Sequence, residues 1–271
     1  MTTEESQIDT SVPHSARRYN YWLGGKDHFE VDRRSGDKVA AAFPPIRTAA
    51  RLNRAFLQRA VRFLAAEAGI RQYLDVGTGL PTADNTHEVA QAIAPASRIV
   101  YVDNDPIVLV HARALLTSTR EGVTTYAEAD LSRPDTILKA AQLREILDLG
   151  QPVALLLVAV LHFLPDDAVA ADAVRQLVAA LAPGSFVVLS HAASDLLDDA
   201  SRERIEAMFD QGNEHGPFQM RAKGQIAAFV EGLELIDPGL VPIQTWRADT
   251  DTDVLPDDQV GMYGVVAYKE H

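Results

Sequence analysis

The segment YLDVGTGLPTADNTHEVA (residues 73–90) decides the fold, because an apolar run leads into two glycines and then into a helical pattern. Glycines allow a sharp backbone turn and a close approach to a ligand, which the free N–H groups of a following helix can hold. Asn85 and Glu88 have the spacing of a capping box, so the helix should begin near Asn85. The segment predicts a strand, a ligand-binding turn and a helix, although a purely structural turn would use the same glycines.

Strand and helix patterns alternate along the chain that follows. The expected strands cover 71–76, 97–104, 123–130, 152–160 and 185–192, and the expected helices lie near 85–94, 106–118, 134–148 and 166–181. Strands that alternate with helices of this length form parallel βαβ units, and the wholly apolar run at 152–160 suits a central strand covered on both faces. The pattern predicts a doubly wound α/β sheet.

The C-terminal part departs from this alternation. Helices near 198–211 and 222–231 precede two expected strands, at 233–243 and 260–269. No helical pattern separates the two strands, which predicts an antiparallel hairpin at the end of the sheet. We therefore expect a mostly parallel, seven-stranded sheet with an antiparallel C-terminal strand.

The N-terminal part has a different character. Residues 1–14 are polar and acidic without an apolar period, and we expect them to be disordered or extended. Residues 15–68 have a helical pattern. The expected organisation is a single domain over 15–271, with a helical cap or lid (15–68) on a Rossmann-like core (69–271).

Composition disfavours several classes of protein. The 271 residues are 47% hydrophobic and 23% charged, as in ordinary soluble globular proteins. The net charge of −13 disfavours nucleic acid as the main partner, and the lack of cysteine removes disulfides and thiolate metal sites. The longest apolar run, 152–165, is too short to span a membrane, and the N-terminus is unlike a signal peptide. We expect a cytoplasmic protein without a metal site; its oligomeric state is not predicted.

Three successive expected strands each have an aspartate at or next to their carboxyl end. Asp75 lies two residues before Gly77, Asp103 ends the second strand, and Asp130 ends the third. The carboxyl ends of parallel strands form the edge at which α/β sheets bind ligands. A helix cap or a solvated loop explains each aspartate alone better than a site does, but three in register indicate a site.

The residues around the glycines favour one cofactor over another. A dinucleotide fingerprint requires a glycine where this chain has Thr82, and Asp75 would repel a pyrophosphate bound at the loop. S-adenosylmethionine has no phosphate and carries an ammonium, a carboxylate and a sulfonium group. An acid beside the loop suits its positive end, so the sequence favours S-adenosylmethionine over NAD.

With these residues the chain resembles the class I S-adenosylmethionine-dependent methyltransferases. More narrowly, it resembles an actinobacterial family of S-adenosyl methyltransferases, formerly a domain of unknown function. The segments ARRYNYWLGGKDHFEVDR (16–33) and DVGTGLPTADNTHEVAQ (75–91) carry the resemblance, which extends from about Ala16 to the C-terminus. The class usually has a third glycine at the position of Pro81, and proline there agrees with the narrower family.

The resemblance implies the role of each residue that matches the class. The residues implied at the cofactor are Asp75, Gly77, Thr78 and Gly79 in the loop, Asp103 and Asn104 at the ribose, and Asp130 and Leu131 at the adenine.

The N-terminal signature adds a dense set of polar and aromatic groups. We assign Tyr19, Asn20, Gly24 and Lys26 to the cofactor site, as parts of a lid over the cofactor. The alternative is that the aromatic residues anchor an N-terminal helix and the glycines only turn the chain.

Methyl transfer needs a base only if the acceptor must lose a proton. His162 follows the central strand and is our candidate for that base, whereas a histidine packed behind the cofactor is the competing interpretation. His191 has the same two interpretations. No Asn-Pro-Pro-aromatic motif follows the central strand, so chemistry on amino groups is not supported.

The function we expect is methyl transfer from S-adenosylmethionine to an unidentified, small-molecule acceptor. A protein that binds S-adenosylmethionine without catalysis, as a sensor or interaction module, is the main alternative. An NAD-dependent oxidoreductase is less favoured because of Asp75 and Thr82.

Overall fold

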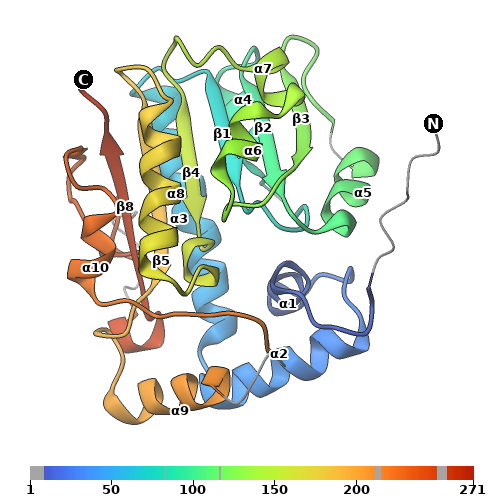
Figure 1. Ribbon diagram of the computed structural model, residues 1–271, viewed down its shortest axis with the longest axis vertical. Helices are drawn as coiled ribbons and strands as arrows, with labels where there is room; N and C mark the ends of the chain where they lie inside the picture. Colours follow the sequence, from blue (N-terminus) through green and yellow to red (C-terminus); the bar gives the residue numbers. More distant parts are fainter. Residues whose placement is uncertain (1–8, 83, 116, 211–214, 249–254) are drawn as a thin grey trace.

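A mixed β-sheet is the centre of the protein (Figure 1). The computed structural model describes residues 9–82, 84–115, 117–210, 215–248 and 255–271. The strands are β1 (Gln72–Val76), β2 (Arg98–Asp103), β3 (Val123–Glu128), β4 (Ala154–Val158), β5 (Phe186–Ala192), β6 (Glu234–Leu235), β7 (Val241–Pro242) and β8 (Met262–Tyr268). Their order is β3-β2-β1-β4-β5-β8-β6, with β7 also paired to β8.

The direction of the strands places the ligand-binding edge. Strands β1 to β5 are parallel, whereas β8 runs antiparallel to β5. The chain moves outward from β1 to β3 and then returns to β4 on the other side of β1. In doubly wound sheets a ligand binds at the carboxyl end of such a switch point, which here lies between β1 and β4.

The expected fold class is confirmed, but within the described part of the chain the sheet has eight strands where seven were expected. The expected strand at 233–243 is divided into β6 and β7, which both pair antiparallel with β8. A turn separates them, in which the Gly239 N–H donates to the Ile236 carbonyl at 2.8 Å. Pro238 lies inside that turn and has no N–H to contribute to a ladder, so a continuous strand cannot form.

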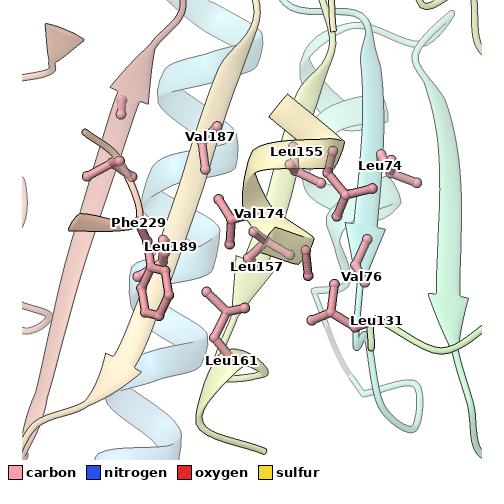
Figure 2. Close-up of a cluster of buried hydrophobic side chains, with 14 of the residues drawn as sticks. Leu74, Val76, Leu131, Leu155, Leu157, Leu161, Val174, Val187, Leu189 and Phe229 are labelled. Atoms are coloured by element: carbon pink, nitrogen blue, oxygen red, sulfur yellow. The ribbon is translucent and has the colours of Figure 1, made fainter. Parts of the chain in front are cut away.

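Helices cover both faces of the sheet. After the first three, they are α4 (Thr86–Ile93), α5 (Pro106–Leu115), α6 (Pro134–Lys139), α7 (Ala141–Ile146), α8 (Asp167–Ala179), α9 (Asp199–Asp210) and α10 (Lys223–Ala228), with short 3-10 turns η1 (Leu161–Phe163) and η3 (Asp257–Gln259). On one face, side chains of β1, β4 and β5 such as Leu74, Leu157 and Leu189 pack with Val174 of α8 and Phe229 (Figure 2). The other face packs against α3 and α4.

The first three helices are α1 (Ser15–Trp22), α2 (Glu30–Ala42) and α3 (Ile46–Ala66). Helix α3 buries Phe56, Leu57, Val61 and Leu64 against the sheet, as the periodicity of the sequence indicates. Helices α1 and α2 lie beyond the carboxyl ends of the parallel strands (Figure 1). Of residues 15–68, expected to form the cap, α3 packs on the sheet; below, the cap denotes only α1, α2 and the loop between them, residues 15–42.

Close packing within the cap depends on a glycine inside α2. A Cβ on Gly36 would lie 2.9 Å from a ring carbon of Tyr21 in α1. The Trp22 indole N–H donates to the Gly36 carbonyl at 3.2 Å.

Most of residues 1–14 lie outside the described part of the chain; residues 9–14 belong to no helix or strand. Among the described residues, no helix has both the length and the apolar character needed to cross a membrane.

Candidate functional site

The glycine loop after β1 passes very close to the end of β4. Gly77 and Gly79 have φ angles of 73° and 69°, in the left-handed region that favours glycine. A Cβ on Gly77 would lie 2.2 Å from Cγ2 of Val160, so no other residue fits there without displacing that side chain. The Gly77 N–H donates to the Val102 carbonyl of β2 at 2.8 Å, which fixes the start of the loop.

The end of the loop is held by the residues that begin α4. The Asn85 N–H donates to Glu88 Oε2 at 2.6 Å, as the capping-box spacing predicts. The Asn85 side chain turns back to the loop, where its Oδ1 accepts from the Thr82 N–H at 3.1 Å. Local hydrogen bonds therefore tie Thr82 to Asn85 and Asn85 to Glu88, which fixes the end of the loop at the start of α4.

Asp103 joins this loop to the next one. Its Oδ2 accepts from the Gly79 N–H at 2.8 Å, and its Oδ1 accepts from the Asp105 N–H at 3.0 Å. The residue is 6% exposed, and burial raises the pKa of its carboxyl group. A carboxylate has about four acceptor positions, so each oxygen retains one for a ligand hydroxyl group.

Asp75 lies deeper, as the next-to-last residue of β1. Its Oδ2 accepts from the Thr86 hydroxyl at 2.6 Å, and its Oδ1 has no hydrogen-bond partner among the described residues. Only 5% of Asp75 is exposed, and burial raises the pKa of its carboxyl group to about 6. A buried acid with an open oxygen favours a cationic ligand group.

The cap contacts both loops directly. A Cβ on Gly79 would lie 3.9 Å from the Ala16 methyl group in α1, and Ala16 packs with Leu80 and Ile107. His14 Nδ1 lies 3.0 Å from Asp105 Oδ2, and Arg17 Nε lies 3.7 Å from the same atom. The turn at residues 103–105 therefore contacts both the glycine loop and the start of the cap.

The contacts of Arg17, His14 and Asp105 were not predicted from the sequence. The only local signal was at Asp105, whose Oδ1 accepts from the Ile107 N–H at 3.0 Å, a typical arrangement at the start of a helix. His14 and Arg17 reach Asp105 across about 90 residues of sequence, and no pattern predicts such a contact.

The predicted site residues of the signature have different environments. The Tyr19 hydroxyl donates to the Ala50 carbonyl at 2.9 Å and accepts from Asn53 Nδ2 at 3.0 Å. Asn20 Oδ1 accepts from the Asp27 N–H at 3.1 Å, inside the loop between α1 and α2. Both polar groups are therefore engaged within the N-terminal helices.

Gly24 and Lys26, the other two signature residues, are exposed on that loop. Gly24 has a φ of 82°, so it serves the turn after α1. Thr78 is half-buried in the glycine loop, and its N–H lies 3.3 Å from the Val102 carbonyl.

The residues predicted at the adenine, and Asn104 at the ribose, do not gather around the glycine loop. Asp130 is half-buried, and its Oδ1 accepts from the Ser132 N–H at 2.8 Å. Leu131 is buried in the core cluster that also contains Val76 (Figure 2). Asn104 is exposed. The structure thus brings Asp75, the glycine loop and Asp103 together and leaves Asp130 at the neighbouring strand.

His162 lies in η1, directly after β4, and is buried. Its Nδ1 accepts from the Ala192 N–H at a long 3.4 Å. Burial, with smaller contributions from His191 and Arg221, holds the pKa of His162 well below its usual range. Burial also lowers the pKa of His191 to about 4. Both imidazoles are neutral at physiological pH.

The strand order, the glycine loop at the switch point and the acid at the end of β2 together define a class I S-adenosylmethionine-dependent methyltransferase. A family profile described as S-adenosyl methyltransferase matches residues 1–270. The chain belongs to this family, it is an enzyme, and its cofactor is S-adenosylmethionine; the sequence-based choice of this cofactor over NAD is confirmed.

Two solved structures are similar over nearly the whole chain, and both come from actinobacteria. A DUF574 family protein from Streptomyces avermitilis MA-4680 is 44% identical, with a TM-score of 0.92 over 97% of this chain and 100% of its own. A candidate methyltransferase from Thermobifida fusca YX is 37% identical, with a TM-score of 0.89 over 100% of both chains. The predicted actinobacterial family is confirmed.

A more distant structure supports the fold alone. Magnesium protoporphyrin IX methyltransferase from Synechocystis PCC 6803, solved with bound S-adenosylhomocysteine, is 15% identical, with a TM-score of 0.54 over 93% of each chain. No curated protein matches the chain.

Replacing Asp75 with asparagine should stabilise the protein at neutral pH. In the unfolded chain this carboxyl group ionises near pH 4, but in the folded protein it ionises only near pH 6. The folded state therefore binds the proton more tightly, and the contribution of Asp75 to the free energy of unfolding falls as pH rises from about 4 to about 6. We expect Asp75→Asn to raise the free energy of unfolding at pH 7.5 by about 1–3 kcal/mol, with little gain near pH 4.

Urea unfolding of both proteins at pH 4 and pH 7.5 measures this difference. Asp135→Asn, at an exposed carboxylate paired with Lys139, is the matched control and should show no comparable gain at pH 7.5. An Asp75→Asn variant that is less stable than the wild type at pH 7.5 would contradict the assignment of Asp75 as a destabilised buried acid.

Proposed function

We propose that this enzyme transfers the methyl group of S-adenosylmethionine to a small-molecule acceptor in the cytoplasm. The observation that best supports this proposal is the hydrogen bonding of Asp103. Each of its two carboxylate oxygens accepts from one loop amide and keeps one acceptor position for the cofactor. Two such positions match the two adjacent hydroxyl groups of the ribose. Asp103 binds them, and the glycine loop of Gly77, Thr78 and Gly79 lies under the amino-acid part of the cofactor.

The charges of the cofactor suit the two ends of this site. The open oxygen of Asp75 accepts from the ammonium group, directly or through water, and the positive charge makes ionisation of the buried acid easier. Asp130 and Leu131, which follow β3, line the adenine, and Asn104, which follows Asp103, lies at the ribose. The methyl group then faces the carboxyl ends of β4 and β5, where acceptors can be positioned for an in-line displacement.

The cap acts as a lid in this proposal. Support comes from Ala16 against Gly79 and from the close contacts of His14 and Arg17 with Asp105, which attach the cap to the two cofactor loops. Tyr19, Asn20, Gly24 and Lys26 belong to the lid: the first two fix its shape and the last two lie at its exposed turn. A lid of this kind excludes water and bulky acceptors, which favours a small molecule over a protein or nucleic acid.

Asp103→Asn should weaken binding of S-adenosylhomocysteine at least tenfold, because loss of hydrogen bonds to a charged group costs roughly 1.5–3 kcal/mol. Calorimetry measures the affinity. Asp198→Asn is the control, because its exposed carboxylate accepts from Ser201 in α9, away from the cofactor loops. Unchanged affinity in Asp103→Asn would mean that another residue binds the ribose.

Closure of the lid should appear in hydrogen–deuterium exchange. Saturating S-adenosylhomocysteine is expected to slow exchange of the α1 amides more than that of the α3 amides, because α1 contacts the cofactor loops and α3 packs on the sheet. Unchanged exchange in α1 with the ligand fully bound would contradict a lid.

Transfer itself is tested with methyl-labelled S-adenosylmethionine and an actinobacterial cell extract divided into small-molecule and protein fractions. We expect label in the small-molecule fraction with the wild type and at least tenfold less with Asp103→Asn at limiting cofactor. Label in the protein fraction would overturn the small-molecule acceptor. Intact cofactor binding with no label in either fraction would favour the sensor alternative.

A further inference from the structure

A fully buried arginine clamps the turn that carries His162. Arg221 is 1% exposed, and it donates from Nη1 to the Leu161 carbonyl at 3.2 Å and from Nη2 to the Leu164 carbonyl at 2.8 Å. Its Nε donates to Asp167 Oδ1 at 2.8 Å. Because the two carbonyls flank His162 in sequence, Arg221 fixes the backbone on both sides of that residue.

Arg221 also decides which nitrogen of His191 carries the proton. Its Nη1 lies 2.9 Å from His191 Nε2. A guanidinium group only donates, so His191 Nε2 must accept. The proton of the neutral imidazole is then on Nδ1, which donates to the Ala192 carbonyl at 2.7 Å.

The position of the proton on His162 follows from its contact with Ala192. The Ala192 N–H donates to His162 Nδ1, so this nitrogen accepts and the proton of the neutral ring is on Nε2. Nε2 has no hydrogen-bond partner among the described residues, and His162 follows β4 at the carboxyl edge of the sheet, where the acceptor is proposed to lie.

We propose that Arg221 is a positioning residue which, by holding the backbone on both sides of His162 and the His191 ring beside it, keeps His162 in place as a hydrogen-bond donor to the methyl acceptor. The proposal rests on the proposed transfer to a small molecule. In this arrangement neither nitrogen of His162 has a free lone pair, so His162 does not remove a proton from the acceptor. The acceptor accordingly presents a carbonyl, ether or anionic oxygen to Nε2, and its methylated atom reacts without help from a base at His162.

The wild-type protein alone provides the first test. Nitrogen-15 spectra of the full-length protein labelled at histidine, with and without S-adenosylhomocysteine, report the tautomer of each ring; single His162 and His191 substitutions assign the signals. We expect His191 protonated on Nδ1 and His162 on Nε2, with neither titrating between pH 5.5 and 8.5. A His162 ring protonated on Nδ1, or one that titrates in this range, would overturn the proposal.

Two substitutions separate positioning from simple packing. Arg221→Met removes every donor, whereas Arg221→Lys keeps one that can reach His191 Nε2. In Arg221→Met we expect mixed tautomers of His191 and His162 and at least tenfold slower labelling of the small-molecule extract, with unchanged affinity for S-adenosylhomocysteine. Arg221→Lys should restore the tautomers and part of the rate. If Arg221→Met does not fold, the wild type and Arg221→Lys decide.

Arg175→Met is the control, because this arginine is exposed on α8 and pairs only with Asp172 among the described residues. It should keep the wild-type tautomers and rate. A folded Arg221→Met with wild-type tautomers would show that Arg221 has a merely structural role. A wild type with the expected tautomers but no labelled product would overturn the proposed function and leave the tautomer assignment intact.

Discussion

The carboxylate of Asp103 is the interaction on which the site depends. It binds the Gly79 amide of one loop and the Asp105 amide of the next, so two loops that are separate in sequence become one surface. Burial makes this carboxylate costly to ionise, and the two amides offset part of that cost. The same turn contacts His14 and Arg17 through Asp105, so the position of the cap follows from the position of the loops.

Buried arginines give the acidic chain its positive groups near the site. Arg17, Arg18 and Arg221 are each almost completely buried, although the chain as a whole carries a net charge of −13. Arg18 donates from Nη1 to the Ser35 hydroxyl at 3.1 Å and to the His215 carbonyl at 2.5 Å, which joins the cap to the segment before α10. Each guanidinium holds together segments that are remote in sequence, because its donors point in several directions at once.

Local sequence patterns were sufficient to predict the core and the conformation of the glycine loop. Strand, glycine turn and helix follow one another between Gln72 and Ile93, and the positions of Asp75 and Asp103 follow from strand register. The packing of α1 was not predictable, because its buried residues are Ala16, Arg17, Arg18 and Asn20 and give no apolar period. Arg221 lies about 60 residues from the turn that it holds, so its role appears only when β5 and the segment before α10 are seen side by side. The expected strand at 233–243 was wrong because a turn divides it into β6 and β7, and the apolar pattern of the sequence gave no sign of that turn.

The contact between Gly77 and Val160 has a consequence for how related sequences can diverge. The backbone enters a left-handed turn at Gly77, and its α-carbon faces a branched side chain with no room for a methyl group. A larger residue at position 77 therefore requires a smaller one at position 160 and still strains the turn, whereas position 160 can shrink freely while glycine remains. We therefore expect the two positions to vary together with unequal tolerance, although the chain places one after β1 and the other after β4.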